Sequence, residues 1–242
     1  NSNVEPLDYA QLRPALRLGI VRRPLVETAT EGGQIPAQTM IPPSLKDAEG
    51  DVFQEKTGTY GIETTAKVEE AKKLLAEAGF ENGEGFPELE LVYNTSDSHQ
   101  KVAEAIQEMW KENLGVEVTL ANQEWGVFQS TRREHDFDIA RGGWIGDYRD
   151  PLTFLGMFKS GSPMNHSDWN NEKYDKILEE SMTAKGQERF EMLFEADKLL
   201  MDAAIVSPIY YYTDINQISN EVKGWELNAK NTWYFGRAEM VN

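Results

Sequence analysis

One segment of the chain brings a cation, an aromatic ring and a carboxylate close together. Residues 136–151 read DFDIARGGWIGDYRDP, in which glycines separate Arg141, Trp144 and Asp147. Glycines let the backbone of a ligand approach closely. We expect residues 137–141 to form a strand, and in open α/β sheets ligands bind beyond the carboxyl ends of strands. Arg141 and Asp147 could therefore meet a zwitterion there, although a surface loop in which both residues pair with neighbours is the alternative.

Other chemistries find less support. The three histidines, His99, His135 and His166, fall in separate predicted elements and show no metal-ligand spacing. The chain has no cysteine, no nucleophile motif of the G-x-S-x-G or S-x-x-K type and no phosphate-binding glycine loop. We therefore expect no metal, no cofactor and no enzymatic activity. With 41 acidic residues, an acid/base carboxylate pair remains possible.

The elements that must position the 136–151 segment follow from hydrophobic periodicity. Strands are predicted at 89–93, 116–120 and 137–141, with helices at 97–113 and 125–133 between them. This β-α-β-α-β succession predicts an α/β fold. A helix is expected ahead of it at 68–78, and residues 31–60 should form an ordered loop.

The last third of the chain is predicted to be more helical. A short helix is expected to end at residue 158, followed by a loop at 160–171, helices at 172–182 and 187–203, and a strand at 205–212 that Pro208 should make irregular. The final residues contain Trp225, Trp233, Tyr234 and Phe235, and such an apolar tail should pack on something.

Composition and charge exclude several classes of protein. Lys+Arg 24 against Asp+Glu 41 gives a net charge of −17, which repels phosphates, so we expect no nucleic-acid partner. The longest uncharged apolar stretch, 203–213, is about half the roughly 20 residues that a transmembrane helix needs. The absence of cysteine fits a cytosolic or a bacterial extracytoplasmic protein. The first residues lack a signal-peptide pattern, so we expect any export signal to have been removed or to lie upstream.

Six pieces of the sequence resemble one protein family. In chain order they are LRPALRLGIVRRPLVETATEGGQIPAQTMIPP, VEEAKKLLAEAGF, LVYNTSDSHQKVAEAIQEMWKENLGVEV, NQEWGVF, DFDIARGGWIGDYRDPLTFL and AIVSPIYYY. The fifth piece resembles the W-x-x-D-Y-x-D-P signature of the oligopeptide-binding proteins of bacterial ABC importers, extracellular solute-binding family 5. The chain departs from the family at Pro14, inside an expected helix, and at residues 20–23.

The resemblance implies a fold and a division of the chain. It implies the C-terminal lobe of a class C (type II) periplasmic-binding-protein fold, with a mixed β-sheet flanked by helices. Residues 1–213 would be the ligand-binding lobe, and residues 214–242 would return to an N-terminal lobe that precedes these motifs in the family and is missing here. This predicts exposed hydrophobic surface, or a rearrangement, in the terminal segment.

By matched position, the resemblance also assigns a peptide-binding role to five residues. It implies that Asp147 binds the α-ammonium group of a peptide, and that Arg141 and His99 face the C-terminal carboxylate. Trp125 and Trp144 would form aromatic walls of side-chain pockets. Polar residues at 94–97 and tyrosines at 210–212 could contact ligand or could equally be structural.

The implied activity is binding and delivery. The protein would hold oligopeptides between two lobes outside the cytoplasm, in a periplasm or as a lipoprotein on the cell surface, and pass them to a permease driven by an ATPase. Similar proteins bind nickel complexes, haem, murein peptides, pheromones or oligosaccharides, so a non-peptide ligand is an alternative. An enzyme that uses cleft carboxylates, or a module that does not bind ligand by itself, are further alternatives.

Overall fold

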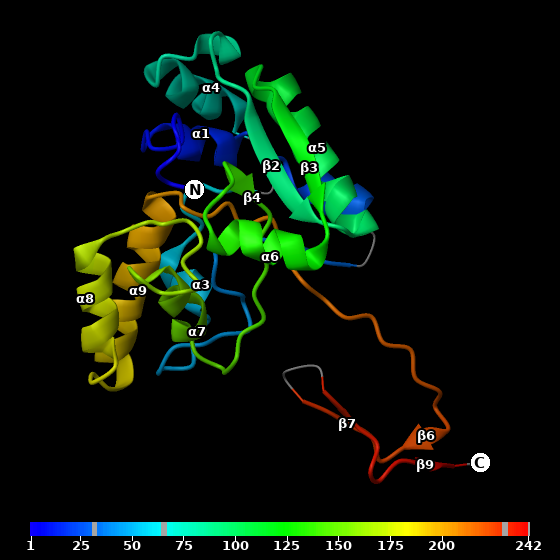
Figure 1. Ribbon diagram of the computed structural model, residues 1–242. Helices are drawn as coiled ribbons and strands as arrows, with labels where there is room; N and C mark the ends of the chain where they lie inside the picture. The colour runs from blue at the N-terminus through cyan, green and yellow to red at the C-terminus, as the bar shows by residue number, and fades with distance from the viewer. Residues whose placement is uncertain (31–32, 64–66, 229–231, 242) are drawn as a thin grey trace.

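The computed structural model describes residues 1–30, 33–63, 67–228 and 232–241. The chain forms an α/β unit, a helical unit and a terminal segment that lies beyond the helical unit, away from the sheet (Figure 1). The helices are α1 (Leu12–Leu18), α2 (Arg22–Leu25), α3 (Phe53–Thr57), α4 (Val68–Glu77), α5 (Asp97–Leu114), α6 (Trp125–Arg133), α7 (Leu152–Leu155), α8 (Glu172–Ser181) and α9 (Gly186–Asp202), with shorter helical turns η1 (Val26–Thr30), η2 (Glu81–Gly83) and η3 (Gly156–Phe158). The strands are β1 (Ile35–Pro36), β2 (Leu89–Asn94), β3 (Val118–Gln123), β4 (Ile139–Ala140), β5 (Tyr210–Tyr211), β6 (Val222–Lys223), β7 (Glu226–Leu227), β8 (Trp233–Tyr234) and β9 (Glu239–Met240).

A parallel three-stranded sheet is the centre of the α/β unit. Its strand order is β3-β2-β4, with Leu91 of β2 opposite Leu120 on one side and Ile139 on the other. The predicted β-α-β-α-β succession is confirmed. Antiparallel pairs, β1 with β5, β6 with β9 and β7 with β8, form separate two-stranded ladders. The chain therefore combines parallel and antiparallel strands flanked by helices, as the resemblance implied.

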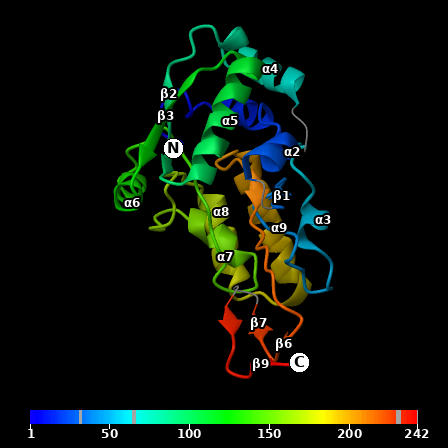
Figure 2. The same cartoon turned by 90° about the vertical axis from the view of Figure 1, so that its right-hand side faces the viewer.

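Helices α1, α4 and α5 pack with the sheet into one hydrophobic core (Figure 2). The apolar face of α5 is buried as its spacing predicts, and the Trp110 indole also donates to the Leu16 carbonyl at 2.8 Å. Gly115 ends α5 in a left-handed conformation with φ 69°, where a Cβ would lie 2.2 Å from the Asn82 carbonyl oxygen. Pro14 is tolerated because it lies in the first turn of α1, where helical N–H groups have no acceptor.

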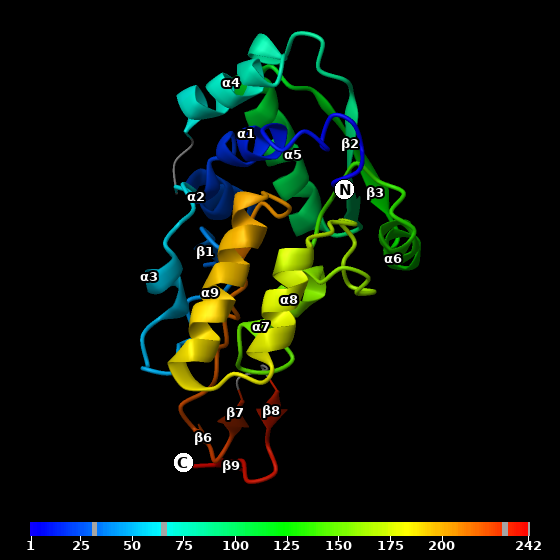
Figure 3. The ribbon, with the colours of Figure 1, turned by 90° about the vertical axis from the view of Figure 1, so that its left-hand side faces the viewer.

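The helical unit has its own core. Helices α8 and α9 lie side by side (Figure 3), and α3 and α7 pack against α9. The Phe53 ring of α3 lies 4.7 Å from that of Phe194, and the buried Tyr174 hydroxyl donates to the Leu155 carbonyl at 2.7 Å. The hydrogen bond from Tyr174 holds α7, which follows the 136–151 segment directly.

Three arginines join the two units. Arg13 and Arg17 donate to carbonyls at the C-terminal end of α9, where the helix leaves its last carbonyls unpaired. Arg22, only 1% exposed, donates through Nε to the Pro208 carbonyl at 2.6 Å. Burial, followed by the charge of Arg17, lowers the pKa of Arg22 to about 9. Because these bonds hold the backbone at Met201, Ala203 and Pro208, they fix the path of the chain into β5.

The expected strand at 205–212 is too long. Strand pairing is confined to β5, where Tyr211 lies opposite Ile35. Pro208 has no N–H to donate, and its carbonyl is held by Arg22, so this stretch cannot extend the ladder.

The terminal segment leaves large apolar side chains in solvent. Ile215 is 77% exposed and Phe235 58%. The rings of Trp225, Trp233 and Phe235 pack on one another, with centroids 5.2 and 5.9 Å apart. Apolar surface of this kind is typical of a site that contacts another surface. No helix in the described parts of the chain has the length and apolarity to cross a membrane.

Candidate functional site

The predicted ligand-binding residues begin at one edge of the parallel sheet. Strand β2 ends at Asn94 and α5 follows at once, so His99 lies in its first turn. Strand β4 ends beside β2, and the Arg141 N–H still donates to the Val92 carbonyl at 2.9 Å. Strand β3 ends before Trp125, the first residue of α6. Since the strands are parallel, these three carboxyl ends share one edge, which is where α/β sheets bind ligands.

Arg141 is the centre of a polar cluster at this edge. Its Nη1 lies 3.4 Å from Asn94 Oδ1, and its Nη2 donates to the Tyr212 hydroxyl. The same hydroxyl lies 3.5 Å from His99 Nε2 and 3.4 Å from the Tyr210 hydroxyl. We call Asn94, His99, Arg141, Tyr210 and Tyr212 the Arg141 cluster. It unites two predicted residues, Arg141 and His99, with polar and tyrosine residues whose role the sequence left open.

The electrostatics of the Arg141 cluster suit an anion. Burial and, to a smaller extent, the positive charge of Arg141 lower the pKa of His99. The same two causes, again with burial the larger, lower the pKa of Arg132 in α6. Burial and the hydrogen bond with Tyr212 raise the pKa of Tyr210, so that its hydroxyl stays protonated. The cluster thus offers one guanidinium fork and neutral hydrogen-bond donors within a chain of net charge −17. A carboxylate accepts hydrogen bonds from both kinds of donor.

Asp147 lies further along the same segment, on a loop fixed at both ends. Arg141 holds the start of the loop, and Asp150 at its end makes two hydrogen bonds with Arg189 of α9, at 2.7 and 2.8 Å. The Asp147 N–H donates to Thr153 Oγ1 at 3.0 Å. Within the described residues no hydrogen bond or ion pair occupies the Asp147 carboxylate, which is exposed and free to accept a cationic group.

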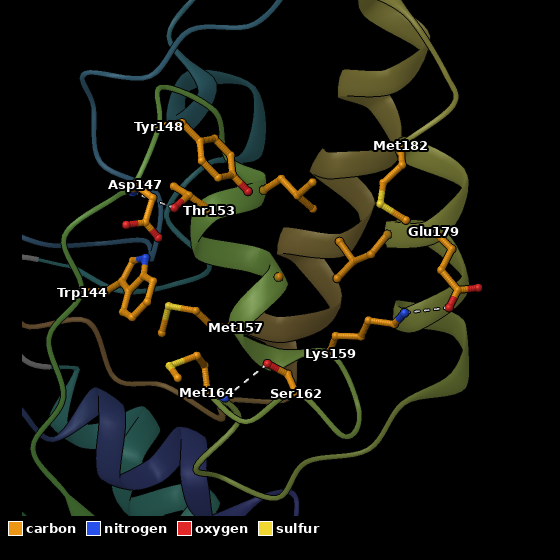
Figure 4. Close-up of a pocket in the computed structure, with 13 residues that line it drawn as sticks. Trp144, Asp147, Tyr148, Thr153, Met157, Lys159, Ser162, Met164, Glu179 and Met182 are labelled. Carbon is orange, nitrogen blue, oxygen red and sulfur yellow. Dashed lines mark hydrogen bonds and ion pairs between the residues drawn. The ribbon is translucent and has the colours of Figure 1, made fainter. Parts of the chain in front are cut away.

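A groove of about 410 Å³ opens beside Asp147 (Figure 4). Trp144 and Asp147 line one side, and Met182 and Glu179, from the end of α8, line the other. Trp144 is half-buried, and its indole Nε1 is buried without a hydrogen-bond partner among the described residues. Trp144 thus lines this groove, and its role as the wall of a ligand side-chain pocket stays a prediction.

Trp125 lies apart from both groups. It is 52% exposed, and its ring centroid lies 6.1 Å from that of the buried Phe128. Arg132 lies over the same Phe128 ring at 5.3 Å. In the part of the chain that the structure describes, Trp125 has no ring contact or hydrogen bond with Arg141 or Asp147. Its role as a pocket wall stays a prediction.

Sequence reasoning missed the methionines of the groove. Met157 belongs to η3, Met164 to the following loop, and Met182 directly follows α8. They share no motif, and only the packing of α7 and α8 within the helical unit brings them together. Arg132 was also missed, although its i,i+4 spacing from Phe128 is a signal that could have indicated their contact.

Three carboxylates elsewhere come close enough to suggest a metal ligand set. Oxygens of Asp47, Glu49 and Asp51 lie within 4.8 Å of one another. However, Lys56 pairs with Asp51 at 2.7 Å, and Asp47 accepts two backbone N–H groups at 3.0 and 2.9 Å. These contacts explain why the three carboxylates lie close together without requiring a metal ion.

Comparison with known proteins gives the family of a chain with this fold and this arrangement of charged residues. Residues 1–166 match the family described as bacterial extracellular solute-binding proteins, family 5 Middle. Because this match covers more than half of the 242 residues, the chain belongs to that family.

Individual relatives agree with this assignment. The chain is 36% identical to the oligopeptide-binding protein OppA of Bacillus subtilis, covering 98% of this chain and 44% of that protein. It is 36% identical to the periplasmic murein peptide-binding protein MppA of Escherichia coli, covering 100% and 44%.

Solved structures of family members also match this chain. The Escherichia coli murein tripeptide binding protein MppA matches with a TM-score of 0.83 and 34% identity, covering 100% of this chain and 47% of that one. Haemophilus influenzae OppA in complex with RPPGFSPFR matches with a TM-score of 0.81 and 30% identity, covering 100% and 47%. The periplasmic-binding-protein fold is therefore confirmed, and the chain spans less than half the length of these relatives.

Proposed function

We propose that this chain is the ligand-binding lobe of an extracytoplasmic peptide-binding protein that serves an ABC importer. Residues 1–213 form the lobe, and residues 214–242 return to a second lobe of the same protein. Peptide is held between the lobes and released to a membrane permease, while a separate ATPase supplies the energy. The family assignment supports the class, and relatives named for oligopeptides and murein peptides support the ligand.

The observation that carries this proposal is the opposite charge at two points of one segment. The Arg141 cluster presents cationic and neutral donors at the sheet edge, and the Asp147 carboxylate, six residues further along, has no partner among the residues that the structure describes. A peptide is a zwitterion, so its carboxylate would bind Arg141 and His99, and its α-ammonium would bind Asp147. Each contact is a charge-assisted hydrogen bond, the strong kind in a closed site.

This division of roles explains how one site could accept many sequences. Fixed contacts go to the two termini and to the peptide backbone, which can bind as an added strand. Side chains would then enter pockets walled by Trp125 and Trp144, where water can complete hydrogen bonds that the protein does not make. Such binding needs no bond cleavage and no cofactor.

The terminal segment supports the two-lobe arrangement. Phe235 and Met240 are 58% and 66% exposed, although large apolar side chains are usually covered. A second lobe of the same protein would cover them. The site would lie between the lobes, and closure would remove Asp147 and its ligand from water.

The test combines a variant with a modified peptide. In the full-length protein, Asp147→Asn should weaken binding of a free tripeptide by about tenfold or more, because a buried charged hydrogen bond contributes at least about 1.5 kcal/mol. N-terminal acetylation of the peptide should weaken binding to the wild type in the same way. It should have little further effect on the variant, since both changes remove one interaction. Asp136→Asn, an exposed aspartate on the same segment before β4, is the matched control.

Two results would contradict the proposal. Undiminished affinity of Asp147→Asn in a calorimetric titration would remove Asp147 from the site. A single non-peptide mass carried through purification of the full-length protein, seen by native mass spectrometry, would assign Asp147 and Arg141 to another ligand.

A further inference from the structure

Tyr211 of β5 places its hydroxyl inside a small buried network of hydrogen bonds. The hydroxyl donates to the Thr39 carbonyl at 2.7 Å and accepts from the Gln54 side-chain amide of α3. The same amide donates to the Ile41 carbonyl and to Thr39 Oγ1, both at 2.7 Å. We call Thr39, Ile41, Gln54 and Tyr211 the Tyr211 anchor. Thr39 and Ile41 are buried, so these hydrogen bonds are shielded from water and strengthened by it.

The two neighbours of Tyr211 point to the other side of the chain. Successive side chains alternate in an extended strand, and the rings of Tyr210 and Tyr212 pack edge to face with centroids 5.1 Å apart. Their hydroxyls lie 3.4 Å apart, and the Tyr212 hydroxyl contacts both Arg141 and His99. A rotation of the chain at Tyr211 would therefore move both hydroxyls away from Arg141.

The strand pairing at this point is short. Strand β5 pairs with β1 over two residues, and one of the β1 residues, Pro36, has no N–H to donate. Arg22 holds the chain further upstream. Downstream, Tyr212 is 54% exposed and residues 214–217 are exposed as well. The position of the Tyr212 hydroxyl therefore depends on the backbone that carries it, and the Tyr211 anchor holds that backbone.

We propose that Tyr211 is a positioning residue for the carboxylate end of the peptide. Through the Tyr211 anchor it holds the hydroxyls of Tyr210 and Tyr212 beside Arg141, where they orient the guanidinium fork and add donors for a carboxylate. The Tyr211 hydroxyl is taken up by Thr39 and Gln54, so it acts through its neighbours. This inference rests on the proposed function, because it requires the peptide carboxylate on Arg141.

Calorimetric titration of the full-length protein with Ala-Ala-Ala and with its C-terminal amide tests this role. Tyr211→Phe removes only the hydroxyl, and affinity for Ala-Ala-Ala should fall about fivefold, the scale of one net hydrogen bond. Affinity for the amide should change by less than about twofold, since the amide has no carboxylate to bind. In a Tyr212→Phe background, Tyr211→Phe should change the preference for the free acid by less than about twofold, because both changes remove one interaction.

Tyr174→Phe is the matched control. It also removes the hydroxyl of a buried tyrosine, within the helical unit, and it should leave the ratio of the two affinities unchanged. Gln54→Met removes the amide that donates to Tyr211 and should reproduce the selective loss without altering Tyr211 itself.

Equal losses for Ala-Ala-Ala and its amide in Tyr211→Phe would assign Tyr211 a structural role only and overturn the inference. An unchanged affinity for Ala-Ala-Ala would overturn it as well, and so would a full fivefold loss of the acid preference in the Tyr212→Phe background. These three results leave the proposed function in place. If the wild type itself bound the acid and the amide equally, the assignment of the carboxylate to Arg141 would fail, and this inference with it.

Discussion

Asp197 of α9 is a carboxyl group buried with little compensation. Its side chain is fully buried, and its Oδ2 accepts a hydrogen bond from the Tyr60 hydroxyl at 2.7 Å. Its Oδ1 has no partner among the described residues. Burial raises the pKa of Asp197 from 3.8 to about 6, and the hydroxyls of Tyr60 and, to a smaller extent, Thr57 only partly oppose this. The protein should therefore be more stable when Asp197 is protonated.

The pKa shift sets both the sign and the size of the effect. Between about pH 4 and pH 6 the folded protein holds this proton more tightly than the unfolded chain does. The stabilising contribution is thus present below about pH 4 and lost as pH rises through 6. A shift of about two units corresponds to about 3 kcal/mol at 1.36 kcal/mol per unit. Asp197→Asn should remove this pH dependence.

Urea unfolding of the purified protein at several pH values between 4 and 7 measures the effect. The free energy of unfolding of Asp197→Asn, relative to the wild type, should rise by about 3 kcal/mol between pH 4 and pH 7. Any cost of burying the new amide is independent of pH and cancels in this comparison. His166, whose pKa is lowered to about 4 mainly by burial, titrates with the opposite sign in both proteins and also cancels.

The matched control is Asp202→Asn on the same helix. Asp202 is exposed and paired with Lys198, so its replacement should change stability by less than about 1 kcal/mol at either pH. If wild type and Asp197→Asn show parallel pH profiles, burial does not raise the pKa of Asp197 and the reasoning is refuted.

Two further predictions concern the site and the core. Arg141→Lys keeps the charge but loses the guanidinium fork that reaches Asn94 and Tyr212. Affinity for peptides with a free C-terminal carboxylate should therefore fall about tenfold, while affinity for C-terminally amidated peptides stays the same. Equal losses of affinity for both kinds of peptide, measured by titration, would argue against a carboxylate at Arg141. Tyr174→Phe leaves the buried Leu155 carbonyl without its hydrogen-bond donor. The free energy of unfolding, measured by urea titration, should therefore fall by about 1–2 kcal/mol. A loss below about 0.5 kcal/mol would contradict this prediction.

Local sequence patterns were sufficient to predict the elements that deliver the site. Helix α6 spans the predicted residues, 125–133, and β2 begins at Leu89 as expected. Helical and strand periodicities are local properties, so apolar spacing and glycine signals are enough to predict such elements. The parallel order of the strands then places the residues that follow them at one edge. The positions of Arg141 and His99 at that edge could be predicted in this way.

Long-range packing decided the rest of the site. The Tyr212 hydroxyl joins Arg141 and His99 across separations of 71 and 113 residues, and no spacing in the sequence predicts that contact. It depends on Arg22, whose buried guanidinium holds the chain at Pro208 and so shortens the expected strand before β5.

The groove beside Asp147 could not be predicted from the sequence either. Met164 and Met182 line the same groove as Trp144 only because α7 and α8 pack in one core. The sequence by itself determined the elements that deliver the site, the family resemblance and the order of the charged residues along the 136–151 segment, whereas residues 31–60, expected as a loop, contain β1 and α3. The tertiary structure alone decided which side chains meet, because close packing of distant elements depends on the shape and volume of the whole core and not on any one local pattern.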